Sequence, residues 1–267
     1  MNNKSSSEII QSLVLKAKKA QSIFENYNQN QVDEVITAVA WTLCKPSNNK
    51  KISNLAVSET GLGNPEDKIL KNRRKTLGLL RDLKNIKTVG VISEDKEKGI
   101  IEIAKPVGVV AAVTPSTNPA ATPINNIINA LKGRNSIIVS PSPAGSKVFR
   151  DLLILINNEL KKIGAPENLI QTFDCDVTKE LTNELMKNVD LVIVTGSLNN
   201  VREAAKSGTK AIGVGQGNVT SIVDETADLE DAFKKIKMSK ILSRRFTTTF
   251  LMNKFLIKLL NCWCRQI

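Results

Sequence analysis

Hydrophobic positions in the first third of the chain recur at helical spacing. Apolar residues repeat every three to four positions over 9–24 and again over 32–43, and this spacing places their side chains on one face of a helix. Pro46 and the polar residues after it interrupt the pattern, which predicts a third helix at 52–59. A glycine-containing turn then precedes a fourth, basic helix at 66–84. The pattern therefore predicts a helical layer over the first 88 residues.

The next part of the chain contains short apolar runs. Two runs at 89–93 and 99–104 flank a charged segment, which predicts an antiparallel hairpin. The continuous apolar run at 107–113 is typical of a strand buried on both faces, and Thr122 followed by Pro123 predicts the cap and first position of a helix. Further strands are expected at 136–139, 169–173, 191–194 and 211–214, with helices at 147–163, 178–187 and 197–206. This alternation predicts an α/β fold with a doubly wound parallel sheet.

Small, hydroxyl and amide residues follow four of the predicted strands. They occupy 114–119, 140–145, 195–197 and 213–218, without a carboxylate. Parallel strands end at one edge of a sheet, where α/β proteins bind ligands, and donors of this kind suit a phosphate or diphosphate. Ordinary turn and capping chemistry explains any single loop equally well, whereas four loops in register favour a ligand site. The glycines at 213, 215 and 217 do not form a dinucleotide fingerprint by themselves.

Composition and charge narrow the chemistry. The chain has 267 residues, a formal net charge of +12 and no histidine, which excludes dyads and zinc sites built on histidine. No acidic residue follows Asp231, whereas nine basic residues do, leaving 29 basic and 26 acidic residues before that point. Because the charge is concentrated at one end and lacks a basic–aromatic platform, it does not indicate nucleic-acid binding. For the basic residues at 71–75, a solvated helix face is favoured over a contact with a phosphate.

We expect a cytoplasmic protein. The first residues contain no apolar stretch of the kind that a secretory signal needs, and no apolar run reaches the length of about 20 residues that spans a bilayer. The four cysteines show no paired spacing, which favours reduced thiols and gives no metal-binding pattern. Neither a membrane nor a metal is therefore expected as a partner.

A dense motif runs from Lys105 to Pro123, and further segments with the same family pattern lie at 59–64, 71–82, 125–142, 194–197 and 212–219. Together these segments resemble the CoA-acylating branch of the aldehyde dehydrogenases. The resemblance covers roughly residues 10–240 and is strongest to the acetaldehyde and sulfoacetaldehyde dehydrogenases (acylating).

The resemblance implies a reaction, its cofactors and its partners. In this family a cysteine thiolate attacks a small aldehyde, a hydride passes to NAD or NADP, and the acyl group is transferred to coenzyme A. The resemblance also implies the family's fold, in which a helical layer and a doubly wound cofactor domain accompany a catalytic domain. Intact family members are homo-oligomers.

The resemblance also assigns roles to the loop residues. Asn118 resembles the amide of the oxyanion hole, whose N–H group stabilises a developing alkoxide. The other family positions bind the cofactor: Thr114, Pro115, Ser116 and Thr117 beside it, Ser140, Pro141 and Ser142 near the adenosine ribose, Gly196 and Ser197 facing the diphosphate, and Gly213, Gly215 and Gly217 on the nicotinamide side. The glutamate base of classical members is absent, as is common in acylating members.

The family's nucleophile has no counterpart in this chain. After Ser239-Lys240 the family continues to its cysteine, whereas this chain continues with Ile241 and has no cysteine at the matching place. Cys262 and Cys264 have no matching neighbourhood. We therefore expect the catalytic domain to be missing and the chain, by lineage an acylating aldehyde dehydrogenase, to be inactive. The alternative is a non-catalytic dinucleotide-binding or regulatory subunit.

The tail at 241–267 is interpreted as the product of a shifted reading frame. The codons required for Asn261-Cys262-Trp263-Cys264 give Leu-Leu-Val when they are read two bases later, whatever their degenerate bases. A genuinely divergent terminus is the alternative, and we expect a poorly packed helix or a disordered end at 246–260. The expected organisation is a helical segment at 1–88, a hairpin with the dinucleotide-binding unit at 89–240, and this tail.

Overall fold

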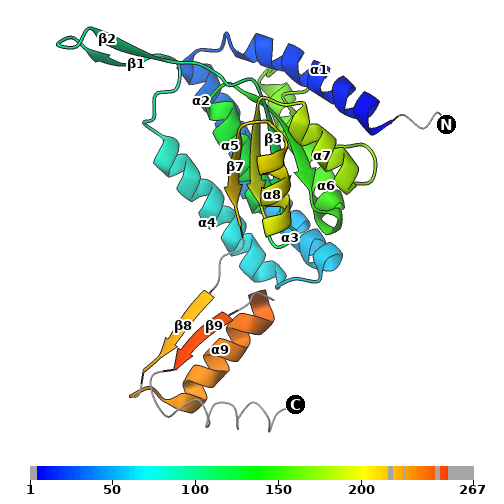
Figure 1. The fold of residues 1–267 in the computed structure, drawn as a ribbon, viewed down its shortest axis with the longest axis vertical. Helices are drawn as coiled ribbons and strands as arrows, with labels where there is room; N and C mark the ends of the chain where they lie inside the picture. The colour runs from blue at the N-terminus through cyan, green and yellow to red at the C-terminus, as the bar shows by residue number, and fades with distance from the viewer. Residues whose placement is uncertain (1–4, 216–218, 225, 244–246, 252–267) are drawn as a thin grey trace. The chain divides into compact units, whose positions relative to one another are not determined.

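The computed structural model describes residues 5–215, 219–224, 226–243 and 247–251 (Figure 1). The chain divides into two compact units, Met1–Gly215 and Gln216–Ile267. The first unit contains four N-terminal helices, a hairpin and a five-stranded sheet, and the described residues of the second form two strands and a helix. Within the described ranges, no helix combines the length and the hydropathy that crossing a bilayer requires.

Four helices form the predicted N-terminal layer: α1 (Ser6–Phe24), α2 (Gln29–Cys44), α3 (Pro46–Thr60) and α4 (Pro65–Leu83). Ser5 and Asn28 cap α1 and α2 with their side chains, each in a reciprocal capping box. The predicted interruption between the second and third helices is confirmed at Lys45, but the predicted start of the third helix at 52 is wrong, because α3 begins at Pro46. Proline is tolerated at the first helical position, where an N–H has no helical acceptor.

β1 (Gly90–Asp95) and β2 (Ile100–Ala104) form the predicted antiparallel hairpin. Figure 1 shows this hairpin projecting away from the sheet of the first unit. Large apolar side chains are exposed on both strands, including Val91 at 43% and Ile101 at 57%. The guanidinium of Arg134 donates to the carbonyl oxygens of Ala104 over 3.0 Å and Glu25 over 2.6 Å. The base of the hairpin is therefore tied to the end of α1.

Five parallel strands form the central sheet: β3 (Val109–Thr114), β4 (Ser136–Pro141), β5 (Ile170–Gln171), β6 (Leu191–Thr195) and β7 (Ala211–Val214). Their order is β5-β4-β3-β6-β7, so the chain builds outward from β3 on one side and then returns to build on the other. The connections contain α5 (Ala121–Lys132), the short η1 (Pro143–Gly145), α6 (Ser146–Lys162), α7 (Lys179–Lys187) and α8 (Leu198–Lys206). This order confirms the doubly wound parallel sheet.

Both faces of β3 are buried, as its continuous apolar run predicts. Alternate residues of the strand face two apolar cores. One core contains residues of α2, α5 and α6, and the other contains residues of α1 and α7. Packing on both sides fixes the strand and with it the start of the loop that follows.

α5 begins two residues earlier than the sequence predicts. Ala120, rather than Thr122, precedes the helix, and no side chain caps it. Pro123 therefore occupies the third helical position. The missing N–H is tolerated there because none of the first N–H groups of a helix has a helical acceptor.

In the second unit, β8 (Val219–Val223) pairs in parallel with β9 (Thr247–Leu251), and α9 (Leu229–Ser243) lies between them in the chain. Lys240, where the family pattern ends, falls within α9. Residues 247–251 form a strand instead of the expected helix or disordered end, which agrees with the high strand propensity of their consecutive threonines. Residues 252–267 of the expected tail lie outside the described residues.

Candidate functional site

The candidate site lies at the carboxyl ends of β3 and its neighbours, where the strand order reverses. Thr114 at the end of β3 is in register with Pro141 of β4, and the backbone N–H of Ser142 donates to the Thr114 carbonyl oxygen over 3.0 Å. After β6, a Cβ at Gly196 would lie 4.0 Å from Pro115 Cβ. The loops after β3, β4 and β6 therefore meet at one edge, which is where doubly wound sheets bind ligands.

Several hydroxyl groups at this edge are buried and unpaired. Among the described residues, the side-chain oxygens of Thr114, Thr117, Ser142 and Ser146 have no hydrogen-bond partner, and Ser116 lies half-buried in the same loop. Buried polar groups are normally paired in native proteins, so unpaired groups gathered in one place indicate a ligand. Hydroxyl donors and acceptors of this kind fit the ribose hydroxyls and phosphates of the dinucleotide expected from the sequence.

Two of the serines expected to bind the cofactor have protein partners. The hydroxyl of Ser140, a residue 1% exposed, lies 2.9 Å from Thr182 Oγ1 in α7. The hydroxyl of Ser197 caps α8 by accepting from the backbone N–H of Asn200 over 3.2 Å. Both side chains therefore stabilise the fold, and the N-terminus of α8 is the feature near Ser197 that suits an anion.

The glycines at 213 and 215 have a packing explanation. A Cβ at Gly213 would lie 2.6 Å from Val201 Cγ1, and a Cβ at Gly215 would lie 2.9 Å from Leu198 Cδ2. Both partners belong to α8, so the two glycines allow this helix to pack closely on β7 and the residue after it. The expected approach of a nicotinamide at these glycines stays a prediction, and Gly217 lies outside the described residues.

Asn118, the predicted oxyanion residue, contacts α4. Its side-chain oxygen accepts a hydrogen bond from Lys71 Nζ over 2.9 Å. The carbonyl oxygen of Thr117 accepts a second one from Lys68 Nζ over 3.4 Å. Burial, followed by the positive charge of Lys71, lowers the pKa of Lys68 below the ordinary lysine value. Two lysines on one face of α4 therefore hold the loop that follows β3.

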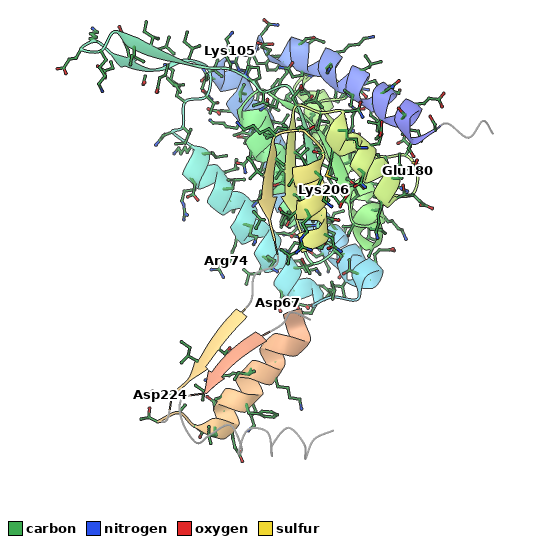
Figure 2. The ribbon with its side chains drawn as sticks, in the orientation of Figure 1. Asp67, Arg74, Lys105, Glu180, Lys206 and Asp224 are labelled. Carbon is green, nitrogen blue, oxygen red and sulfur yellow. The ribbon has the colours of Figure 1, made fainter. Side chains whose placement is uncertain are left out.

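Lys71 is the site residue that the sequence pattern does not reveal. The residues at 71–75 are expected to form a solvated face, and Arg74 indeed extends away from the sheet (Figure 2). Lys71, although exposed, differs because it reaches Asn118, 47 positions later in the chain. The signal available in the sequence was that both residues lie in segments carrying the family resemblance.

Among the described residues, the loops that follow β3, β4 and β6 contain no cysteine. Cys44 is the last residue of α2, and Cys175 lies in the loop between β5 and α7, so both free thiols are outside the loops that follow β3, β4 and β6. Burial raises the pKa of the Cys44 thiol, and the charge of Arg73 offsets only part of that rise, so the thiol is a weak nucleophile at neutral pH. Cys262 and Cys264 lie outside the described residues. The described part also contains no group of three side chains suited to a metal ion.

Known proteins resemble the chain in sequence and in structure. Residues 2–244 match the model of the aldehyde dehydrogenase family. The sulfoacetaldehyde dehydrogenase (acylating) of Cupriavidus necator is 52% identical over 233 residues, 87% of this chain and 47% of that protein. An acetylating aldehyde dehydrogenase from Geobacillus thermoglucosidasius has a TM-score of 0.83 and 33% identity, covering 98% of this chain and 59% of its own. An engineered glycolyl-CoA reductase solved with bound NADP+ has a TM-score of 0.77 and 29% identity, and the match covers 96% of this chain and 59% of the reductase chain.

These matches agree on the fold and differ in length from the chain. The chain spans about half the length of the curated relatives it matches. The matched residues 2–244 include the whole parallel sheet and every loop of the candidate site. The chain therefore belongs to the aldehyde dehydrogenase family.

Proposed function

We propose that this chain is the cofactor-binding part of a CoA-acylating aldehyde dehydrogenase and binds NAD or NADP at the ends of β3, β4 and β6. The observation that carries the proposal is the set of buried, unpaired hydroxyl groups of Thr114, Thr117 and Ser142 where the strand order reverses. The relative solved with NADP+ supports the choice of ligand.

Each part of the site has its own task in this proposal. The hydroxyl groups of Thr114, Thr117 and Ser142 hydrogen-bond to the ribose and phosphate oxygens of the dinucleotide, and the N-terminus of α8 faces its negative charge. The nicotinamide supplies a hydride acceptor when it is bound. Asn118 donates an N–H group to the aldehyde oxygen and stabilises the negative charge that develops there when a thiolate attacks the carbonyl carbon.

The loop after β4 suits NADP as well as NAD. Residues 140–145 contain no carboxylate. In many dinucleotide sites a carboxylate hydrogen-bonds to the ribose 2′-hydroxyl of NAD, and its negative charge repels the 2′-phosphate of NADP. Without such a carboxylate, this loop presents the unpaired hydroxyl group of Ser142, which accepts either form.

The proposed substrates of the whole enzyme are coenzyme A and a small aldehyde, either sulfoacetaldehyde or acetaldehyde. The name of the Cupriavidus necator relative supports sulfoacetaldehyde and an acylating reaction. Because the described loops of the site contain no cysteine, we infer that the chain by itself binds the dinucleotide without oxidising aldehyde. That observation also favours the second candidate function, a non-catalytic dinucleotide-binding or regulatory subunit. The unpaired spacing of the cysteines favours a cytoplasmic location.

Isothermal titration calorimetry with NADP+ and NAD+ tests the binding site. We expect Ser142→Ala to weaken binding about fivefold, the effect of losing one hydrogen bond of ~1 kcal/mol. Ser58→Ala is the matched control. Ser58 is an exposed residue of α3 whose hydroxyl donates to the Leu55 carbonyl oxygen, so the affinity of this variant should equal that of the wild type. A folded wild-type chain that binds neither dinucleotide would refute the proposal.

A turnover assay tests the inferred lack of oxidation. The chain is mixed with NADP+, coenzyme A and sulfoacetaldehyde or acetaldehyde, and reduced cofactor is followed by its absorbance. We expect no reduced cofactor above the protein-free rate. Production that is abolished by Cys262→Ala or Cys264→Ala would show that a nucleophile is present after all.

We also propose a shifted reading frame as the origin of the residues after Lys240. The family match ends at residue 244, close to the position where the sequence pattern departs from the family. Sequencing of the gene tests this proposal. If the proposal holds, the frame read two bases later continues as the sequence of an aldehyde dehydrogenase. An unrelated sequence in that frame would refute the proposal and leave a divergent terminus as the explanation.

A further inference from the structure

Lys68 and Lys71 lie one helical turn apart on α4, and both reach the loop that follows β3. The spacing of three residues places the two side chains on the same face of the helix. Lys68 Nζ donates to the Thr117 carbonyl oxygen over 3.4 Å, and Lys71 Nζ donates to Asn118 Oδ1 over 2.9 Å. Consecutive loop residues are thus held by one helix face.

The contact with Lys71 determines which way the Asn118 amide points. A lysine ammonium has three donors and no acceptor, so the atom that faces it must be the amide oxygen. The amide nitrogen then lies on the other branch of the planar group, away from the ammonium. Among the described residues, the Asn118 side chain takes part in a hydrogen bond only as the acceptor from Lys71. Its N–H groups are therefore available to the oxygen of a ligand.

The turn of α4 that carries Lys71 is fixed to α3 by buried polar contacts. Asn72 Nδ2 donates to Asn49 Oδ1 over 3.0 Å and lies 3.2 Å from Ser53 Oγ. Asn49 Nδ2 in turn donates to the Ile69 carbonyl oxygen over 3.0 Å. These side chains are buried, so the backbone next to Lys71 has a defined position. A fixed backbone lets a long lysine side chain hold its partner reproducibly.

The ammonium of Lys71 also brings positive charge to the Asn118 amide. Its charge is felt nearby, because it contributes to the lowered pKa of half-buried Lys68. A charged donor on the amide oxygen polarises the amide and makes its N–H groups stronger donors. Orientation and polarisation therefore act in the same direction.

We propose that Lys71 is a positioning residue, which holds the Asn118 amide oxygen so that the amide N–H groups face the bound aldehyde oxygen. The proposal rests on the proposed function of Asn118 as a donor to that oxygen. The orientation itself is a property of the chain without ligand. It can therefore be measured independently of cofactor binding.

Carbon-13 NMR of the full chain, labelled at the side-chain carbonyl carbon of asparagine, tests the proposal. Asn118→Asp identifies the Asn118 signal by its loss. A hydrogen bond to the amide oxygen moves this carbon downfield, so we expect Lys71→Met to move the Asn118 signal upfield and Lys71→Arg, which keeps a cationic donor, to restore it. Lys75→Met removes an exposed lysine of the same helix and should leave the signal unchanged.

An Asn118 signal that Lys71→Met leaves in place would overturn the proposal. Absence of NADP+ binding would instead refute the proposed function and leave the Asn118 signal unaffected.

Discussion

Gly213 permits close packing of α8 on β7. A Cβ at this position would lie 2.6 Å from Val201 Cγ1, and a β-branched side chain in a helix has few alternative rotamers. Gly213→Ala should therefore push α8 away from the strand. We expect the free energy of unfolding, measured by urea denaturation, to fall by about 1–3 kcal/mol, the usual cost of overpacking.

Gly78→Ala is the matched control for this substitution. Gly78 lies inside α4, and a Cβ there would meet nothing within 4 Å. Alanine should raise the free energy of unfolding by about 0.5–1 kcal/mol, because glycine is a poor helix former. The packing explanation fails if both substitutions stabilise the chain.

Lys68 is a residue of the site whose protonation should make stability depend on pH. Burial and the charge of Lys71 lower its pKa in the folded chain below 10.5, the ordinary lysine value. Between the folded and unfolded pKa values the unfolded chain binds more protons, so this residue makes stability rise with pH in that window. At neutral pH, below both values, Lys68 is charged in both states and its burial opposes folding.

Lys68→Met removes this effect. We expect Lys68→Met to raise the free energy of unfolding above that of the wild type most at neutral pH. This difference should shrink as the pH approaches 10.5. Urea denaturation at several pH values measures the difference. Lys75→Met, which removes an exposed lysine of the same helix, is the control substitution. A pH-independent difference for Lys68→Met would contradict the role of burial.

At the scale of elements, the hairpin of β1 and β2 exposes large apolar side chains to solvent. Ile100, Ile101 and Ile103 are 51–57% exposed, and a lone two-stranded hairpin is marginally stable in water. Contiguous exposed apolar residues mark an interaction surface. We therefore expect the chain to self-associate through the hairpin and Ile101→Lys to shift it toward the monomer.

Sedimentation velocity over a range of protein concentrations measures this association. Ile154→Lys provides the control, because Ile154 is 60% exposed on α6 and lies outside the hairpin. Equal dissociation by both substitutions would argue against the hairpin as the interface. A wild-type chain that stays monomeric at every concentration would do the same.

The same scale shows which elements sequence patterns predict and which they do not. The strands and loops of the site follow from local signals, such as the apolar run of β3 and the small residues after it. The start of α3 does not, because its polar residue Asn49 is buried by a partner, Asn72, far along the chain. The local sequence likewise does not predict the contact between Lys71 and Asn118, because a lysine on a helix is expected to be solvated unless its partner is known.

At the scale of the whole molecule, the division into two units separates the described site from the C-terminal residues. Both apolar cores consist of residues before Gly215. The unpaired hydroxyl groups and the Asn118 amide also belong to the first unit. The second unit contains the residues on which the reading-frame proposal depends. Folding of the site and the origin of the tail are thus separate questions.

A chain that ends at Gly215 should therefore fold and bind NADP+ with the affinity of the full chain. Its cores and its unpaired hydroxyl groups are complete, so circular dichroism should show an intact fold and calorimetry an unchanged affinity. Ser142→Ala should weaken binding by the same factor in the short and full chains, because the substituted hydroxyl lies in the first unit. A short chain that folds but no longer binds would show that residues beyond Gly215 contribute to the site, with Gly217 as the first to substitute.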